Sequence, residues 1–273
     1  MDPRRLTAEE IGAWLARLKY PRRSALRRLA SDPRRTVREL VGRYERARAA
    51  ARAERQRLRR LYQAERARLA AGQIVAGVDE VGRGCLAGPV VAAAVILPEG
   101  PEIEGLNDSK QLTPAARQRL DEEIRARAIA VAVAEASVEE IDRFNILGAS
   151  RLAMRRALEL LAPLPDFALI DGRDRLPLDL EHAAVIRGDA SCACIAAASI
   201  VAKVARDRLM QDLDLAFPGY GFGQHKGYGT EQHLLALVRL GRSQVHRSAF
   251  LPVAQIALLE FLDDAGRLAG PFG

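Results

Sequence analysis

The stretch IVAGVDEVGRGCLAGP, residues 74–89, decides how the rest of the chain is interpreted. It opens with an apolar run that is rich in β-branched residues and bounded by glycine, which is typical of a strand. Two adjacent carboxylates, Asp79 and Glu80, follow this run, and a second apolar run begins directly after the proline. The pattern predicts an antiparallel hairpin built from residues 74–81 and 86–97, with two acids at its mouth.

The chemistry of this stretch points to a metal-dependent site that handles a phosphate or a sugar. Hard cations such as Mg²⁺ prefer carboxylate oxygens as ligands. The backbone of the Gly82-Arg83-Gly84 turn can approach a ligand closely, because glycine carries no Cβ. Together with Ala87 the turn also matches a dinucleotide-binding fingerprint, but that motif requires a helix where this sequence predicts a strand. An ordinary hairpin with surface acids is the remaining alternative.

The hexapeptide Asp79-Glu80-Val81-Gly82-Arg83-Gly84 resembles the signature of bacterial ribonuclease HII, the type 2 ribonuclease H family. Further blocks that are typical of this family occur in the same order along the chain. They are Asn107-Asp108-Ser109-Lys110, Ile170-Asp171-Gly172, Gly188-Asp189, the run 195–204, Arg206-Asp207 and the run 225–230. The resemblance covers residues 74–253 and is specific, because all the blocks keep the order of the family.

The resemblance implies an α/β fold of the ribonuclease H type, with a mixed sheet of about five strands flanked by helices. It implies hydrolysis of the RNA strand of RNA–DNA hybrids and cleavage 5′ of single ribonucleotides embedded in duplex DNA, leaving 3′-hydroxyl and 5′-phosphate ends. The 2′-hydroxyl is the group that distinguishes RNA from DNA at such a site. The expected partners are the RNA–DNA hybrid duplex and DNA containing ribonucleotides, and the expected role is ribonucleotide excision repair.

By the same resemblance, Asp79, Glu80, Asp171 and Asp189 are the catalytic residues and hold two Mg²⁺ or Mn²⁺ ions. Taken alone, Asp171 could simply begin a loop, and Asp189 stands where a helix N-cap belongs. The resemblance places substrate contacts at Gly82, Arg83, Gly84, Ser109, Lys110, Lys226 and Tyr228. The loop that contains the last two residues mixes aromatic and basic side chains, which suits stacking on bases, although a packed loop is the alternative.

Strand geometry restricts how the two adjacent acids can act. Neighbouring residues on an extended strand point to opposite faces. If the strand continues through both residues, Asp79 and Glu80 cannot both reach one pair of ions with their side chains. Either the strand ends at Asp79, or Glu80 also acts through its main-chain carbonyl.

The net charge of +7 is concentrated at one end of the 273 residues. Residues 1–72 hold 21 basic and 8 acidic side chains, a net charge of +13, whereas residues 73–273 carry −6. A capping box, Thr7-x-x-Glu10, and apolar residues at helical spacing predict helices in the first part. We therefore expect a small all-α basic extension over residues 1–72 and the catalytic domain over residues 73–273.

The role of the extension has two interpretations. Its second half, from Glu45 to Leu69, is rich in arginine, alanine and glutamate with few apolar residues, which predicts a long solvated helix. This helix is either a tether or an electrostatic arm on nucleic-acid phosphates. The arm predicts that deleting the extension weakens substrate binding and flattens its salt dependence, whereas the tether predicts an unchanged slope.

The cysteines and the apolar pattern indicate in which cellular compartment the protein is expected. Cys85, Cys192 and Cys194 form neither a disulfide framework nor a four-ligand zinc set, so we expect buried thiols in a reducing cytoplasm. No apolar run approaches the roughly 20 residues of a membrane span, and the first residues lead into no signal core. We expect a cytoplasmic monomer.

Two other function classes remain as alternatives. A non-catalytic nucleic-acid binder would need only the basic extension, and it would not require four convergent acids. A nucleotide-binding oxidoreductase would use the glycine turn, and the expected strand after that turn argues against it.

Lys203 and Asp207, four residues apart, could pair on one helix without any further role.

Overall fold

The computed structural model describes residues 6–17, 22–100, 102–173 and 176–256. The chain divides into two compact units, residues 1–59 and residues 60–273, and each is described by itself. The domain boundary expected near residue 72 stays a prediction. No helix among the described residues is long and apolar enough to cross a bilayer.

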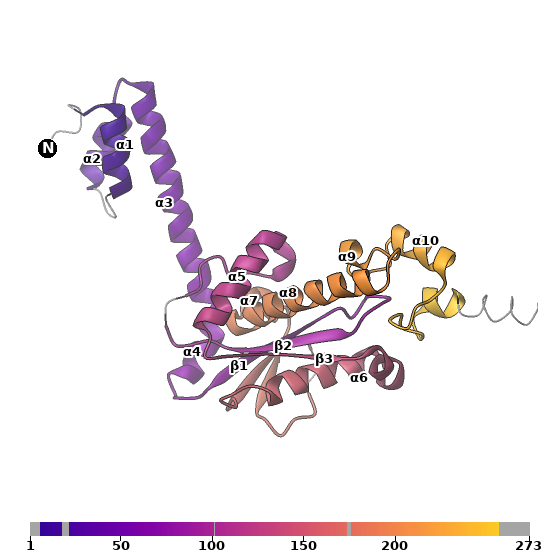
Figure 1. Cartoon of the computed structure of the whole chain (residues 1–273). Helices are drawn as coiled ribbons and strands as arrows, with labels where there is room; N and C mark the ends of the chain where they lie inside the picture. The colour runs from indigo at the N-terminus through magenta and orange to yellow at the C-terminus, as the bar shows by residue number, and fades with distance from the viewer. Residues whose placement is uncertain (1–5, 18–21, 101, 174–175, 257–273) are drawn as a thin grey trace, which may run out of the picture. The chain divides into compact units, whose positions relative to one another are not determined.

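The N-terminal unit is helical, as the sequence predicts. Its helices are α1 (Ala8–Arg17), α2 (Arg23–Ala30) and α3 (Arg35–Leu61), shown in indigo and violet in Figure 1. The predicted capping box is present, because Thr7 Oγ1 accepts from the Glu10 N–H at 3.2 Å and the Glu10 carboxylate accepts from the Thr7 N–H at 2.7 Å. The unit encloses a small core of Ile11, Leu15, Leu26, Leu29, Val37 and Val41.

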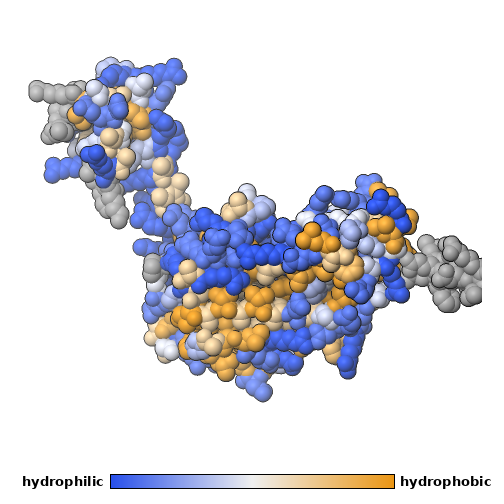
Figure 2. Space-filling model, viewed as in Figure 1, coloured by the Kyte–Doolittle hydropathy of each residue, from blue (hydrophilic) through white to orange (hydrophobic). Residues whose placement is uncertain are grey.

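A strongly basic cleft of about 780 Å³ lies between α2 and α3. Six arginines line it: Arg23, Arg27, Arg48, Arg52, Arg55 and Arg59. Glu45 is the acid among the described lining residues. Hydrophilic residues cover most of the visible face of this unit (Figure 2). The positive charge that the sequence places in the extension therefore gathers in one concave surface.

The predicted long solvated helix over residues 45–69 is wrong in its second half. Helix α3 ends at Leu61, and a separate helix α4 (Gln63–Leu69) follows in the catalytic unit. Tyr62 interrupts the helix, and its buried hydroxyl accepts from the Ile103 N–H at 3.1 Å. Glu65 is also buried. Leu61 and Tyr62 are buried as well, and the burial of apolar surface outweighs the solvation expected from composition.

A mixed sheet of five strands forms the catalytic unit, which confirms the predicted fold class. Its strands are β1 (Val75–Val81), β2 (Val90–Ile96), β3 (Ala130–Ala136), β4 (Phe167–Asp171) and β5 (His182–Val185), in the order β3-β2-β1-β4-β5. Strands β1, β2 and β3 pair antiparallel, whereas β4 and β5 extend the sheet in parallel from β1. The predicted hairpin is present, but β2 begins only at Val90, so residues 82–89 form a loop.

Two long helices cover the two faces of this sheet. Helix α8 (Ala193–Ala216) lies on one face and α6 (Val138–Glu159) on the other (Figure 1). A Cβ at Gly77 would overlap the Cys194 backbone, so the absence of a side chain lets α8 pack directly on β1. Ala76 and Val78 instead join the core that α6 lines. Even-numbered residues of β1 therefore face α6, and odd-numbered residues face α8.

The remaining helices are the 3₁₀ turn η2 (Ser109–Gln111), α5 (Pro114–Arg127), α7 (Gly188–Ser191), α9 (Phe222–His225) and α10 (Glu231–Leu240). The alanine-rich helix expected after Asp189, to about residue 217, is interrupted, because Cys192 is extended between α7 and α8. A predicted C-terminal helix over residues 254–262 lies partly outside the described residues, and the described part is helical from Leu251 to Ile256.

Candidate active site

Three of the four predicted carboxylates gather where neighbouring parallel strands end. Val78 lies opposite Ile170 in the parallel register, so the next residues, Asp79 and Asp171, are also neighbours across β1 and β4. Asp79 is 5% exposed and faces α8, where Ser199 hydrogen-bonds to its carboxylate. Its Oδ1 also accepts from the Glu80 N–H at 2.8 Å. The strand ends thus bring together two acids that lie 92 positions apart in the chain.

The turn after β5 brings Asp189 to the same place. The Gly188 N–H donates to Asp171 Oδ1 at 2.7 Å, which ties the start of α7 to the end of β4. Asp189 itself lies in the first turn of α7 and is not its N-cap, because Arg187, in a left-handed conformation, occupies that position. The alternative of a purely capping aspartate is therefore wrong. Lys110 Nζ lies 3.0 Å from Asp189 Oδ2.

Glu80 lies on the opposite face of β1 from Asp79. The strand continues through Val81 and stays paired with β2, so the alternative in which it ends at Asp79 is wrong. Arg83 donates to Glu80 Oε1 at 2.9 Å. Glu80 Oε2 is buried and has no hydrogen-bond partner among the described residues. One carboxylate oxygen thus remains available for a ligand from outside the chain.

The pKa values of the clustered acids indicate that nearby positive charge does not balance their negative charge. Burial, followed by the charges of Glu80 and Asp171, raises the pKa of Asp79 well above its usual value. Burial also raises the pKa of Glu80, although Arg83 opposes this shift. The pKa of Asp171 is raised by burial and by Asp189. Oxygen ligands, a shortage of cations and an unpartnered carboxylate oxygen fit a hard divalent ion.

Two buried arginines hold the loop that contains the Gly-Arg-Gly turn. Arg206 and Arg247 are both 0% exposed. Arg206 donates to the carbonyls of Ala87 and Pro89 at 3.2 and 3.3 Å. Arg247 donates to the carbonyls of Gly88 and Arg83 at 2.9 and 3.0 Å. The loop carbonyls therefore point inward, which fixes the orientation of the turn above them.

The predicted recognition loop from α9 to α10 lies against the same turn. Cys85 and Tyr228 form an isolated antiparallel bridge, and the Leu86 N–H donates to the Gly227 carbonyl at 2.8 Å. Tyr228 keeps 42% of its surface exposed. The Lys226 carbonyl accepts from Arg206 at 2.8 Å. Fold contacts thus bring the turn at 82–84, Tyr228 and the Lys226 backbone together.

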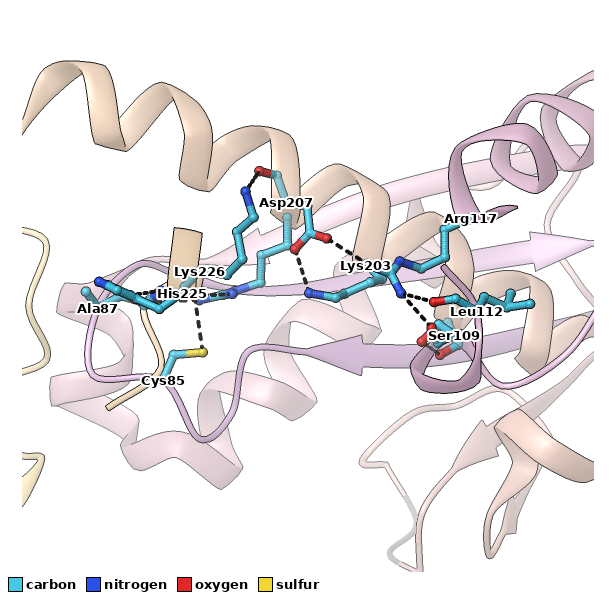
Figure 3. Close-up of polar contacts among 12 residues, drawn as sticks. Cys85, Ala87, Ser109, Leu112, Arg117, Lys203, Asp207, His225 and Lys226 are labelled. Carbon is cyan, nitrogen blue, oxygen red and sulfur yellow. Dashed lines mark hydrogen bonds and ion pairs between the residues drawn. The ribbon is translucent and has the colours of Figure 1, made fainter. Parts of the chain in front are cut away.

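A basic groove of about 490 Å³ continues from this point between α5 and α8. Figure 3 shows Lys203, Lys226 and Arg117 around Asp207. Lys203 Nζ lies 2.6 Å from Asp207 Oδ1, so the predicted i, i+4 pair is present. Lys226 Nζ donates to the Asp207 carbonyl at 3.4 Å, and Arg117 NH2 lies 3.8 Å from Asp207 Oδ2. Four basic side chains line the groove together with the single acid Asp207, so the described lining is positively charged.

Ser109 is placed differently from the other predicted substrate residues. It is buried, and its hydroxyl lies 2.9 Å from the Ser199 hydroxyl. A hydroxyl has one proton, so if Ser199 donates to Asp79 it must accept from Ser109. Ser109 thereby connects the Lys110 turn to the carboxylate cluster. Lys110, by contrast, has an exposed side chain.

Sequence reasoning missed three residues that build the site, namely Ser199, Arg206 and Arg247. Arg206 and Ser199 lie inside blocks that match the family, but nothing in their spacing indicates what they contact. Arg247 carries no motif at all, and its contacts join positions 159 and 164 residues apart. Arg206 stands among Lys203, Asp207 and Arg208 in the sequence, so no local signal indicates that it is the buried charge.

Comparison with known proteins gives consistent matches. The ribonuclease HII family model matches residues 76–253, and the model of the ribonuclease HII N-terminal domain matches residues 7–68. Ribonuclease HII of Geobacillus thermodenitrificans (strain NG80-2) is 46% identical over 253 residues, covering 91% of this chain and 96% of that relative. Ribonuclease HII of Albidiferax ferrireducens is 55% identical over 184 residues, covering 67% of this chain and 88% of that relative. The crystal structure of ribonuclease H2 from Pyrococcus horikoshii OT3 matches with a TM-score of 0.56 at 26% identity, over 68% of this chain and 97% of that one.

Proposed function

Because this chain belongs to the ribonuclease HII family, and is therefore an endoribonuclease H that acts on RNA–DNA hybrids, we propose that it also cuts 5′ of single ribonucleotides in duplex DNA. The products are a 3′-hydroxyl and a 5′-phosphate, and the cellular role is ribonucleotide excision repair. The observation that carries this proposal is the placement of the Gly-Arg-Gly turn beside the carboxylate cluster on the same strand end.

The four carboxylates are proposed to hold two divalent ions, Mg²⁺ or Mn²⁺. Asp79, Asp171 and Asp189 supply side-chain oxygens from three neighbouring elements, and Glu80, whose side chain points to the other face of β1, contributes its main-chain carbonyl. Ions of this kind, when bound, activate a water and stabilise the leaving 3′ oxygen. The raised pKa of Asp79 supports this assignment, because a bound cation would offset the burial and the acidic neighbours that raise it.

Recognition of the ribonucleotide is proposed to rest on the turn and on Tyr228. The backbone of Gly82, Arg83 and Gly84 would meet the 2′-hydroxyl, and a Cβ built at Gly84 touches nothing within 4 Å, which leaves room for a ligand there. The half-exposed ring of Tyr228 would stack on the sugar or base beside it. Lys110 and Lys226 would contact phosphates, with Ser109 holding the Lys110 turn in place.

The setting of the activity is also part of the proposal. We place the enzyme in the cytoplasm as a monomer, with its three cysteines reduced, and all three are buried and outside any disulfide in the structure. A reducing compartment keeps such thiols from oxidation.

One assay tests the proposed substrate. A DNA duplex with a single ribonucleotide, labelled at the 5′ end of that strand, is incubated with the enzyme with Mg²⁺, with Mn²⁺ and with chelator. We expect one product whose 3′ end a DNA polymerase extends, and no product with chelator. A matched all-DNA duplex and a long hybrid serve as controls. Cleavage of the hybrid without cleavage at the single ribonucleotide would rule out the junction specificity.

A further inference from the structure

Three buried side chains of ligand type meet outside the carboxylate cluster. Glu65 comes from α4, Cys192 precedes α8, and Cys194 lies in the first turn of α8. They are 2%, 0% and 0% exposed, and one ligand atom from each lies within 4.8 Å of the others. None of the three belongs to the predicted catalytic set. Their presence in one place therefore needs an explanation of its own.

The spacing of these atoms matches a tetrahedral metal site. Zinc binds thiolate sulfur at about 2.3 Å and carboxylate oxygen at about 2.0–2.2 Å in tetrahedral geometry. Tetrahedral angles then place two sulfurs about 3.8 Å apart and a sulfur and an oxygen about 3.6 Å apart. The two Sγ atoms lie 3.7 Å apart, and Cys192 Sγ lies 3.6 Å from Glu65 Oε1. Two of the three distances therefore have the values of a tetrahedral site, and the third, between Cys194 and Glu65, lies within 4.8 Å.

The charge balance of the cluster also favours a cation. Burial raises the pKa of the Glu65 carboxyl, and burial together with Cys192 and Glu65 raises the pKa of the Cys194 thiol well above its usual value. Among the described residues no basic side chain forms an ion pair with Glu65. A buried carboxylate without a counter-charge is costly. The N-terminus of α8 stabilises negative charge at this point, since the Cys194 N–H donates to Glu65 Oε1 at 2.6 Å.

We propose that Glu65, Cys192 and Cys194 bind one zinc ion, with the fourth position taken by the second Glu65 oxygen or by a water. Binding releases the thiol protons to solvent, because the thiolate is the ligand. This ion is separate from the hard divalent ions of the active site and has a structural role. It joins α4 to the start of α8, and the Cys192 N–H already donates to the Gly188 carbonyl of α7, next to Asp189, at 2.8 Å.

The alternative is that Glu65 only caps α8. Cys192, the N-cap residue, makes no side-chain capping bond, and a carboxylate from α4 can satisfy the N–H groups in its place. Capping needs an oxygen acceptor at position 65 but neither a charge nor a thiolate. Glu65→Gln therefore separates the two roles, because glutamine keeps the acceptor and loses the charge.

Cobalt is the probe that distinguishes this site from the carboxylate cluster. The full-length reduced protein is unfolded in chelator and refolded with Co²⁺ or Zn²⁺ in excess Mg²⁺, because buried ligands take up metal as the chain folds. Thiolate ligation gives an intense near-ultraviolet charge-transfer absorption, which oxygen ligands do not give. We expect that absorption, one zinc per chain after dialysis, and a higher melting temperature of the zinc-loaded protein.

Matched variants make each outcome decisive. Cys194→Ser should abolish the thiolate absorption, whereas Cys85→Ser and Asp79→Asn should retain it. Glu65→Gln should keep the fold and weaken zinc binding by about tenfold or more. Absence of the thiolate absorption from the reduced wild-type protein, or unchanged zinc affinity in Glu65→Gln, would overturn the proposal and leave Glu65 as a helix cap. Neither result depends on cleavage activity, so both are independent of the proposed function.

Discussion

Asp79 combines burial with two acidic neighbours, Glu80 and Asp171, which suits its proposed role as a metal ligand. Its raised pKa means that the folded state disfavours its charge when no cation is bound. The buried charge lowers the stability of the folded protein, since a protein with a neutral side chain of the same size at this position would be at least as stable. The same reasoning predicts opposite effects of one substitution on activity and stability.

Asp79→Asn should lower the cleavage rate on the order of a thousandfold, because it removes a ligand charge. This corresponds to a loss of several kcal/mol of transition-state stabilisation. Its melting temperature at neutral pH should equal or exceed that of the wild type, because the buried charge is gone. Asp212→Asn, an exposed change on α8, is the control for the removal of a surface charge. Steady-state cleavage and calorimetry provide the two measurements, and near wild-type cleavage by Asp79→Asn would contradict the proposed two-metal site.

Gly84→Ala should reduce cleavage at single ribonucleotides with only a modest loss of duplex binding. The added Cβ meets no atom of the protein within 4 Å, so it can obstruct only the substrate. Gly82→Ala is the informative contrast, since Gly82 has φ +93° and its Cβ would overlap Arg206. That variant should lower the melting temperature as well. If Gly84→Ala cleaves single ribonucleotides at the wild-type rate, the backbone of this turn does not recognise the 2′-hydroxyl.

At the scale of elements, three histidines connect the recognition loop to the segment after α10. The His233 and His246 Nε2 atoms lie 3.0 Å apart, and the ring of His225 stacks on that of His233 at 4.4 Å. His246 Nδ1 accepts from the Ser243 N–H, so its Nε2 is the donor to His233. Each of these two rings is therefore neutral in this arrangement, and the loop that carries Tyr228 depends on that neutrality.

Stability should fall on acidification because of these histidines. Burial and His233 lower the pKa of His246 to about 4, and burial lowers the pKa of His233. The unfolded chain binds the additional protons, so the contribution is fully present above pH 6.5 and is lost as the pH falls towards 4. For His246 it amounts to about 3 kcal/mol at most. Denaturant unfolding from pH 7 to pH 4.5 should show the loss. His246→Gln should flatten it, and an equal pH dependence in that variant would exclude the cluster as the cause.

At the scale of the whole molecule, the positive charge lies mostly in residues 1–72, which hold none of the predicted catalytic residues. Residues 1–72 carry +13, while the remainder carries −6 and must bind a polyanion. The arginine-lined cleft between α2 and α3 is the surface on which phosphates would be bound. Deleting residues 1–72 would also remove Tyr62 and Glu65, which are buried in the catalytic unit, so point substitutions isolate the effect of charge more cleanly.

Arg48→Gln combined with Arg52→Gln should weaken substrate binding and lower the slope of log K against log salt by about 0.9 for each phosphate that the cleft no longer binds. Turnover at saturating substrate should change little, because no predicted metal ligand lies in this unit. The matched control is Arg35→Gln with Arg43→Gln, which removes the same charge outside the cleft. Substrate binding measured at several salt concentrations distinguishes the electrostatic arm from the tether. Equal slopes in both double variants would favour the tether.

Much of this protein follows from its sequence alone. Two continuous apolar runs predict β1 and β2, the glycines and acids at 79–84 mark the end of the strand, and the order of the blocks identifies the family. The capping box at Thr7 starts a helix where the sequence expects it. These signals are local, since backbone propensity and capping depend on residues within a few positions of one another.

Only the tertiary structure decided which side chains are buried together. Glu65 reaches Cys194 across 129 positions, and Arg247 reaches Arg83 across 164. A sequence shows that such residues are charged, but their burial depends on which distant backbone groups can satisfy their hydrogen bonds. The turn of α3 into α4 at Tyr62 and the unpartnered oxygen of Glu80 have the same origin. Long-range packing sets the polarity around each group, and that polarity determines its chemistry.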